Sequence, residues 1–276
     1  MTPPPAAGDA HPQANRAAVL GGRTVGYVLV RAARRSIGMA VDAQGLSVRA
    51  PRWVSVDDIE RVLQDKAGWI LRKLDEARAR QGQRQALQVI WQDGATLPYL
   101  GRALSVRRGR PVMGDPAEPC ELRQGRVRVT AHWQAAAGPG LASTLWLDVP
   151  SGAGEPQWRA LTQAWFLQQA RILFPQRLQH FSAPLGVRCT RLTLSNAGTR
   201  WGSASRDGSI RLNWRLMHFD PAIIDYVVAH ELSHLRVMDH SPLFWRTVES
   251  VMPDYAARRL ALRQTPSPDW SPADAA

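Results

Sequence analysis

The stretch from residue 220 to residue 234 constrains the fold of this chain more than any other. It opens with Asp220-Pro221, a typical helix start: the Asp side chain accepts a hydrogen bond from a free backbone N–H, and proline has no N–H to leave unpaired. Apolar residues then recur at helical spacing at positions 223, 224, 227, 228 and 235. The sequence therefore predicts an α-helix with an apolar face to bury.

Two histidines, His230 and His234, lie four residues apart on this predicted helix. Four residues advance an α-helix by about 6 Å and about 40°, so both rings leave the same face and can bind one ion. With Glu231 between them they form the H-E-x-x-H arrangement of zinc hydrolases. A catalytic zinc takes three protein ligands and leaves one position to water, so a third ligand is expected. We predict that it is His240, which directly precedes the predicted start of the next helix at residue 242.

This arrangement predicts one Zn²⁺ per chain and a hydrolytic mechanism. The ion would activate a water molecule, and Glu231 would take the proton of that water and return it to the leaving amine. A purely structural zinc is the alternative interpretation, but such a site usually contains cysteines, and Cys120 and Cys189 are both far from the motif in sequence.

Three further polar residues precede the predicted metal helix. Asn196 and Arg200 precede a predicted hairpin in which residues 201–205 and 210–214 are joined by a turn at 206–208, and Asn213 lies within its second strand. Each is a candidate for a substrate contact or for a hydrogen bond behind the metal ligands, and each is equally explained as a turn or strand-edge residue. The sequence does not choose among them.

The chain resembles the YgjP-like metallopeptidase family, and more distantly the SprT-like proteases, which act on proteins attached to DNA. The resemblance is strong in the C-terminal third and looser from residue 27 to residue 104; its clearest segments are residues 200–205, 210–216, 225–234, 239–241 and 244–245. It implies a zinc-dependent metallopeptidase with a zincin-like core. One position departs from the family: Ala204 stands where its Trp-Gly-Ser-Cys-Ser run has cysteine.

The order of the elements predicts an α+β fold. We expect flexible tails over residues 1–20 and 265–276, and one metallopeptidase domain over 21–264. Within it, residues 21–150 are predicted to be rich in strands, with one amphipathic helix from about Ser55 to about Arg78. Residues 155–264 are predicted to form a minimal zincin-like core around the H-E-x-x-H helix.

Composition limits the location and the partners of the protein. The 276 residues contain only two cysteines, and no apolar run approaches the length of a membrane span, so we expect a cytoplasmic protein with no membrane contact. Protein or peptide substrates are expected from the motif. The net charge of +12, with an arginine cluster at residues 31–35, leaves nucleic acid open as a partner. A zinc-stabilised nucleic-acid-binding module without catalysis is therefore the second functional hypothesis, although such a module would not need Glu231.

Overall fold

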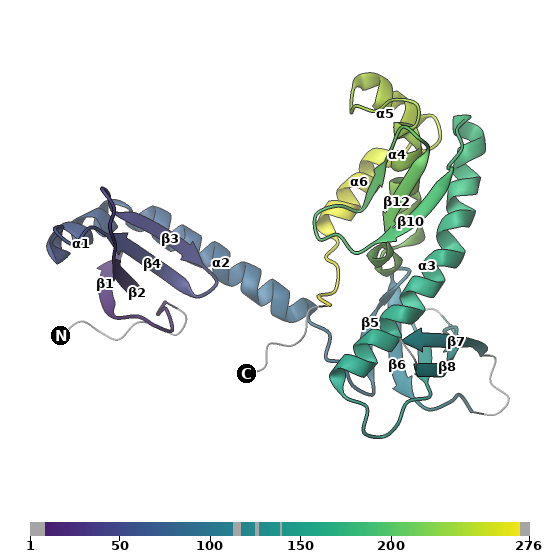
Figure 1. Cartoon of the computed structure of the whole chain (residues 1–276), viewed down its shortest axis with the longest axis horizontal. Coiled ribbons are helices and arrows are strands. Elements are labelled where there is room, and N and C mark those ends of the chain that lie inside the picture. Colours follow the sequence, from purple (N-terminus) through teal and green to yellow (C-terminus); the bar gives the residue numbers. More distant parts are fainter. Residues whose placement is uncertain (1–8, 113–116, 125–126, 139, 271–276) are drawn as a thin grey trace. The chain divides into compact units, whose positions relative to one another are not determined.

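The computed structural model describes residues 9–112, 117–124, 127–138 and 140–270 (Figure 1). The protein is a mixed α/β protein with a strand-rich N-terminal region, as the sequence predicts. It divides into two compact units, Met1–Ala86 and Leu87–Ala276. The boundary falls inside the strand-rich part that we expected to be continuous over residues 21–150. The strands after residue 86 therefore belong to the same unit as the helix predicted at residues 220–234.

Unit 1 contains a four-stranded sheet and two helices. Its elements are β1 (Arg16–Leu20), β2 (Arg23–Arg31), β3 (Gly38–Asp42), β4 (Gly45–Ala50), α1 (Val56–Asp65) and α2 (Ala67–Leu87). The strand order is β1-β2-β4-β3, with β2 and β4 parallel and the other pairs antiparallel. Alternate residues of β2 and β4 are fully buried together with residues of both helices, so one face of the sheet packs on the helices.

Two expectations for this unit differ from the structure. The predicted flexible tail over residues 1–20 extends too far, because residues 16–20 form β1; its paired backbone and the buried Leu20 hold this Ala-rich segment in the sheet. Residues 1–8 lie outside the described residues. The single predicted amphipathic helix is two helices, which separate at Lys66. Ser55 does cap α1, because its side chain accepts a hydrogen bond from the Asp58 backbone N–H.

Unit 2 contains two sheets. A five-stranded sheet of order β5-β6-β9-β8-β7 is made of β5 (Ala95–Tyr99), β6 (Arg102–Arg108), β7 (Glu118–Gln124), β8 (Val127–Gln134) and β9 (Ser143–Leu147). A three-stranded sheet of order β10-β12-β11 is made of β10 (Arg191–Ser195), β11 (Gly202–Ala204) and β12 (Ser209–Asn213). In the smaller sheet β11 and β12 form the antiparallel hairpin that the sequence predicts, and β10 joins β12 in parallel.

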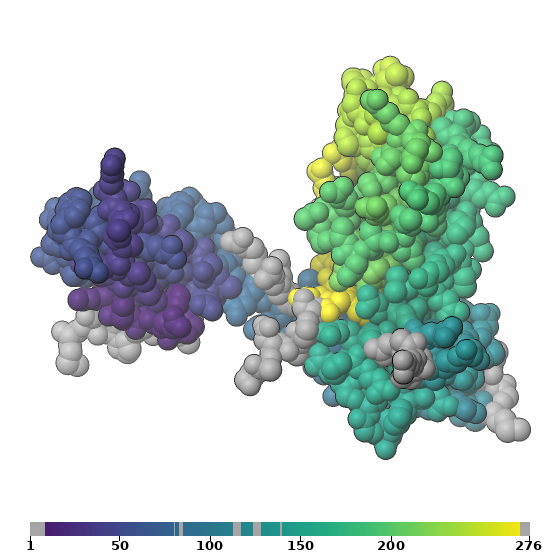
Figure 2. All heavy atoms as spheres, viewed as in Figure 1, coloured from purple at the N-terminus to yellow at the C-terminus, as the bar shows by residue number. Residues whose placement is uncertain are grey.

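The helices of unit 2 build its core around the long helix α3 (Glu155–Leu185). The others are the 3₁₀ helix η1 (Trp214–His218), α4 (Pro221–His234), α5 (Pro242–Glu249) and α6 (Tyr255–Gln264). Helix α3 packs against α4, β7 and β10, and buries Trp165 and Phe166 fully. Side chains of α3 and of the β10–β12 region meet in one continuous surface on the face drawn in Figure 2. Buried residues of α4 and of α3 belong to one apolar core.

The predicted flexible tail over residues 265–276 is also wrong in its first half. Trp270 is only 7% exposed, and its indole Nε1 donates a hydrogen bond to His218 Nε2. The Asp269 backbone N–H donates to the carbonyl of Leu87. The apolar surface of one tryptophan and a buried acceptor thus hold this Pro- and Ser-rich segment in place, while residues 271–276 lie outside the described residues.

Among the described helices, none is both long and apolar enough to cross a membrane.

Candidate metal centre

Helix α4 begins and ends where the sequence predicts. Asp220 is its N-cap and accepts a hydrogen bond from the Ala222 backbone N–H, and Pro221 occupies the first helical position. All residues from Val227 to Ala229 are buried, so the helix is fixed in the core just before His230. A bidentate ion pair between Arg177 of α3 and Asp225 adds a second attachment.

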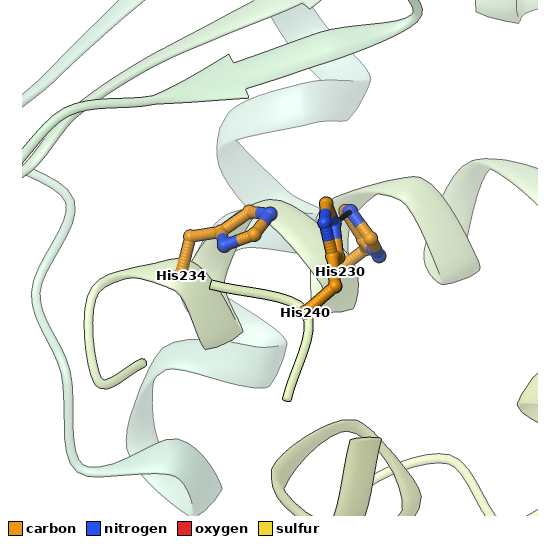
Figure 3. Close-up of side chains that lie close together, drawn as sticks. All are labelled: His230, His234 and His240. Carbon is orange, nitrogen blue, oxygen red and sulfur yellow. Dashed lines mark hydrogen bonds between the residues drawn. The ribbon is translucent and has the colours of Figure 1, made fainter. Parts of the chain in front are cut away.

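Three histidines converge at the C-terminal end of α4. His230 and His234 lie on the helix, and His240 comes from the short segment that joins α4 to α5 (Figure 3). One ring nitrogen from each lies within 4.8 Å of the other two. The Nε2 atoms of His230 and His240 are 3.2 Å apart. The structure therefore brings together the three residues that the sequence nominated as metal ligands.

The donor set fits a zinc ion. Two nitrogens bound tetrahedrally at about 2.0–2.1 Å from one ion lie roughly 3.3 Å apart, close to the separation of the two Nε2 atoms. Metal binding also needs neutral imidazoles. Burial, with the neighbouring histidines adding to it, lowers the pKa of His230 to about 3, and burial lowers the pKa of His234. The Nδ1 atom of His234 is 3.2 Å from the carbonyl oxygen of Val237, a contact that orients the ring.

Two aromatic residues of α5 pack against the histidine rings. Phe244 of α5 is fully buried and stacks on His234, with centroids 4.4 Å apart, and it meets the other two rings edge-on. Trp245 stacks on His240 at 5.7 Å, and the guanidinium of Arg259 lies 4.6 Å from the centroid of Trp245. The rings are thus held on one side by residues that cannot themselves bind a metal.

Glu231 directly follows His230 in α4 and is only 6% exposed. Burial raises the pKa of Glu231 to about 8, and the positive charge of Arg200 opposes that rise. Its carboxylate lies directly over Gly202 of β11: a Cβ added to this glycine would be 2.5 Å from Oε1 and 2.7 Å from Cδ. Only glycine leaves room for the carboxylate at this position.

Two of the three other candidate residues, Asn196 and Arg200, lie in the loop before β11, and Asn213 is the last residue of β12. Asn213 is 2% exposed; its Nδ2 donates to the carbonyls of Ala197 and Arg200, and its Oδ1 accepts from the Arg215 N–H. Asn196 Oδ1 accepts hydrogen bonds from Trp214 Nε1 and from Arg215. These contacts hold the loop in shape. Arg200 is the one of the three candidates whose charge acts on Glu231.

Sequence reasoning assigned no role to Gly202, which makes room for Glu231, or to the pair Phe244 and Trp245, which support the rings. All three occur in segments that carry the family resemblance. Gly202 is far from Glu231 in the chain, so no local pattern reveals their contact. Phe244 lies four residues after His240, in the first turn of a predicted helix. This spacing was the available signal for its contact with the histidine rings.

Comparisons with known proteins identify the family of the chain. The family model described as YgjP-like, metallopeptidase domain, matches residues 35–265. Among solved structures, the chain is similar to the crystal structure of the metallopeptidase zymogen of Pyrococcus abyssi abylysin, with 25% identity over 33% of this chain and 95% of that chain and a TM-score of 0.30. No curated protein sequence matches the chain.

Proposed function

Because the chain belongs to the YgjP-like metallopeptidase family, we propose that it is a zinc-dependent peptidase whose ion is held by His230, His234 and His240. One observation carries the proposal: three imidazoles have ring nitrogens within 4.8 Å of one another, and the buried Glu231 directly follows His230 in α4. The three histidines would leave a fourth position open, as in catalytic rather than structural zinc sites.

Glu231 is proposed as the general base. A zinc ion bound here would lower the pKa of a coordinated water and polarise the carbonyl of the scissile bond. Glu231 would accept the proton of the attacking water and pass it to the leaving amine. Gly202 leaves room for the carboxylate against β11, and Arg200 favours its ionised form.

Strand β11 is the proposed position for a peptide substrate. It is the outer strand of its sheet, paired with β12 on one side, and its first residue, Gly202, touches Glu231. An extended peptide that pairs with the free edge of β11 would have its backbone beside the carboxylate. Protein or peptide substrates are therefore proposed, and Asn196 and Asn213 are assigned the role of keeping the loop before β11 in place.

The second candidate, a zinc-stabilised nucleic-acid-binding module without catalysis, differs in one respect that can be tested. A module without catalysis does not need the buried carboxyl group of Glu231, and burying a carboxyl group costs free energy. A SprT-like protease that acts on DNA-associated proteins is a variant of the first proposal and concerns only the substrate.

The test compares wild type with Glu231→Gln. Zinc content is measured by mass spectrometry under native conditions, and hydrolysis is followed on an unfolded, fluorescently labelled protein with and without DNA. Both proteins should bind about one zinc per chain, and only wild type should cleave. Equal hydrolysis by both would remove Glu231 from the mechanism, and zinc binding with no cleavage by either would favour the binding-module hypothesis.

A further inference from the structure

Unit 1 carries an exposed surface that the metal site does not explain. We name it the arginine–tryptophan surface and define it by four exposed residues, Arg34, Arg49, Arg52 and Trp53. Arg49 lies near the end of β4, and Arg52 and Trp53 lie in the loop that follows it. Arg34 lies in the loop after β2, and its guanidinium lies over Gly38 at the start of β3. Trp53 is 79% exposed, an unusual position for so large an apolar side chain.

The pairing of the strands brings the residues of this surface to one edge of the sheet. Strands β2 and β4 are parallel, so both end at the same edge of the sheet, where Arg31 lies opposite Ala50. The side chain of Arg31 crosses to the loop after β4 and donates hydrogen bonds of 2.7 Å to the carbonyls of Pro51 and Val54. Trp53 lies between these two residues in the chain. Arg31 therefore fixes the loop that presents Arg52 and Trp53.

A glycine on the edge strand brings in a further arginine. Gly38 pairs with Arg49, which in turn pairs with Val30, so side chains at these positions share one face of the sheet. Gly38 has no side chain, and its place is taken by the guanidinium of Arg34, whose Nη1 would lie 2.4 Å from an added Cβ. Arg34, Arg49 and the 45%-exposed Val30 thus form one row on that face.

The arginines at this edge of the sheet have no ion-pair partner. In the described part of the chain, none of Arg31, Arg34, Arg49 and Arg52 forms an ion pair. The acidic residues that follow in sequence are Asp57 and Asp58 of α1, and Asp58 pairs with Arg61. Residues 1–86 hold 14 basic and 8 acidic residues, so half of the net charge of +12 belongs to unit 1.

We propose that the arginine–tryptophan surface binds single-stranded nucleic acid. The arginines provide sequence-independent contacts for the phosphates, and the open face of Trp53 provides a platform on which an unpaired base can stack. An acidic polypeptide would use the same charges but has no need of an exposed aromatic ring. A duplex would offer phosphates but keeps its bases stacked inside, so Trp53 selects the single strand.

The expected salt dependence follows from the number of charges. Three exposed arginines that each contact a phosphate give a slope of about −2 in a plot of log K against log salt concentration for a single strand. Affinity should then fall roughly 20-fold between 50 and 200 mM salt. Removal of one stacking aromatic should weaken binding by about five-fold or more at fixed salt.

The experiment uses the full chain and fluorescein-labelled 20-mers of oligothymidylate and oligouridylate, with binding followed by fluorescence anisotropy at several salt concentrations. Trp53→Ala should weaken binding at least five-fold, and the double variant Arg34→Glu/Arg49→Glu should weaken it further and flatten the salt slope. Comparison of the two oligonucleotides distinguishes DNA from RNA as the source of the ligand. Peptidase activity and circular dichroism confirm that each variant is folded.

Matched controls come from the helices of the same unit. Trp69→Ala removes another partly exposed tryptophan, and Arg61→Glu/Arg72→Glu makes the same change in net charge on α1 and α2. Both controls should bind like wild type. No binding by wild type at 50 mM salt would overturn the proposal, as would equal losses in test and control variants. Tighter binding of polyglutamate than of either oligonucleotide would assign the surface to an acidic protein instead.

Discussion

His218 makes the stability of unit 2 depend on pH. The residue is 3% exposed; its Nδ1 lies 2.7 Å from the carbonyl oxygen of Pro98, and its Nε2 accepts a hydrogen bond from Trp270. The carbonyl needs a donor and the indole N–H needs an acceptor, so the folded state requires the neutral ring with its proton on Nδ1. Burial accordingly lowers the pKa of His218 from 6.5 to about 4, with Arg215 adding to the effect.

The sign and size of the effect follow from the two pKa values. Between pH 6.5 and pH 4 the unfolded chain binds a proton that the folded chain does not, so acidification destabilises the fold. The contribution is fully present above pH 6.5 and lost as pH falls to 4. A difference of about 2.5 pKa units corresponds to about 3 kcal/mol when fully lost, and about 2 kcal/mol is lost at pH 5.

The assay is urea unfolding of metal-free protein at pH 7 and pH 5, followed by circular dichroism, for wild type and His218→Gln. Wild type should lose about 2 kcal/mol more than the variant between the two pH values, because the variant has no imidazole at this position. His180→Gln, which removes an exposed histidine, is the control and should retain the wild-type pH dependence. Identical pH dependence in wild type and His218→Gln would refute the reasoning.

Three further predictions concern α4 and the residues that contact it. Gly202→Ala places a methyl group on the Glu231 carboxylate, so turnover should fall at least ten-fold while zinc content, measured by mass spectrometry, stays at the wild-type value. Arg177→Lys loses the bidentate contact with Asp225 and should destabilise the protein by about 1 kcal/mol in urea unfolding. His234→Ala removes a proposed ligand, so zinc affinity in a competition titration should fall by more than the roughly 10–100-fold typical of losing a residue behind a ligand.

Each of these predictions has a clear control or contradiction. Gly198→Ala adds the same methyl group where nothing lies within 4 Å, so it should leave turnover unchanged. Full activity of Gly202→Ala would mean that the carboxylate does not need its present position. Unchanged stability of Arg177→Lys would show that a single charge contact is sufficient, and unchanged zinc affinity of His234→Ala would place the ion elsewhere.

Local signals in the sequence were sufficient to predict helix α4. Asp220 and Pro221 set its start, and the spacing of its apolar residues gave its buried face, because caps and periodicity are properties of neighbouring residues. The positions of His230 and His234 follow from the same geometry. His240 needed one more inference, that the chain turns back at the start of α5, and the structure places its ring beside the other two.

Contacts between distant residues were beyond local reasoning. Strand β1 lies in a segment whose composition is typical of a tail, and pairing with β2 determines its conformation. Trp270 is held by His218, 52 residues away, and neither residue has a pattern that names the other. The same reason hid Gly202, whose role depends on a carboxylate from another element. Tertiary contacts decided each of these cases against local preference.

X-ray absorption spectroscopy of the zinc-loaded protein tests the central claim most directly. The proposed site predicts three nitrogen ligands of histidine at about 2.0–2.1 Å and one further light-atom ligand from solvent, and the His240→Ala variant should lose one of the three nitrogens. Sulfur at about 2.3 Å, or a spectrum that His240→Ala leaves unchanged, would contradict an open three-histidine site on α4.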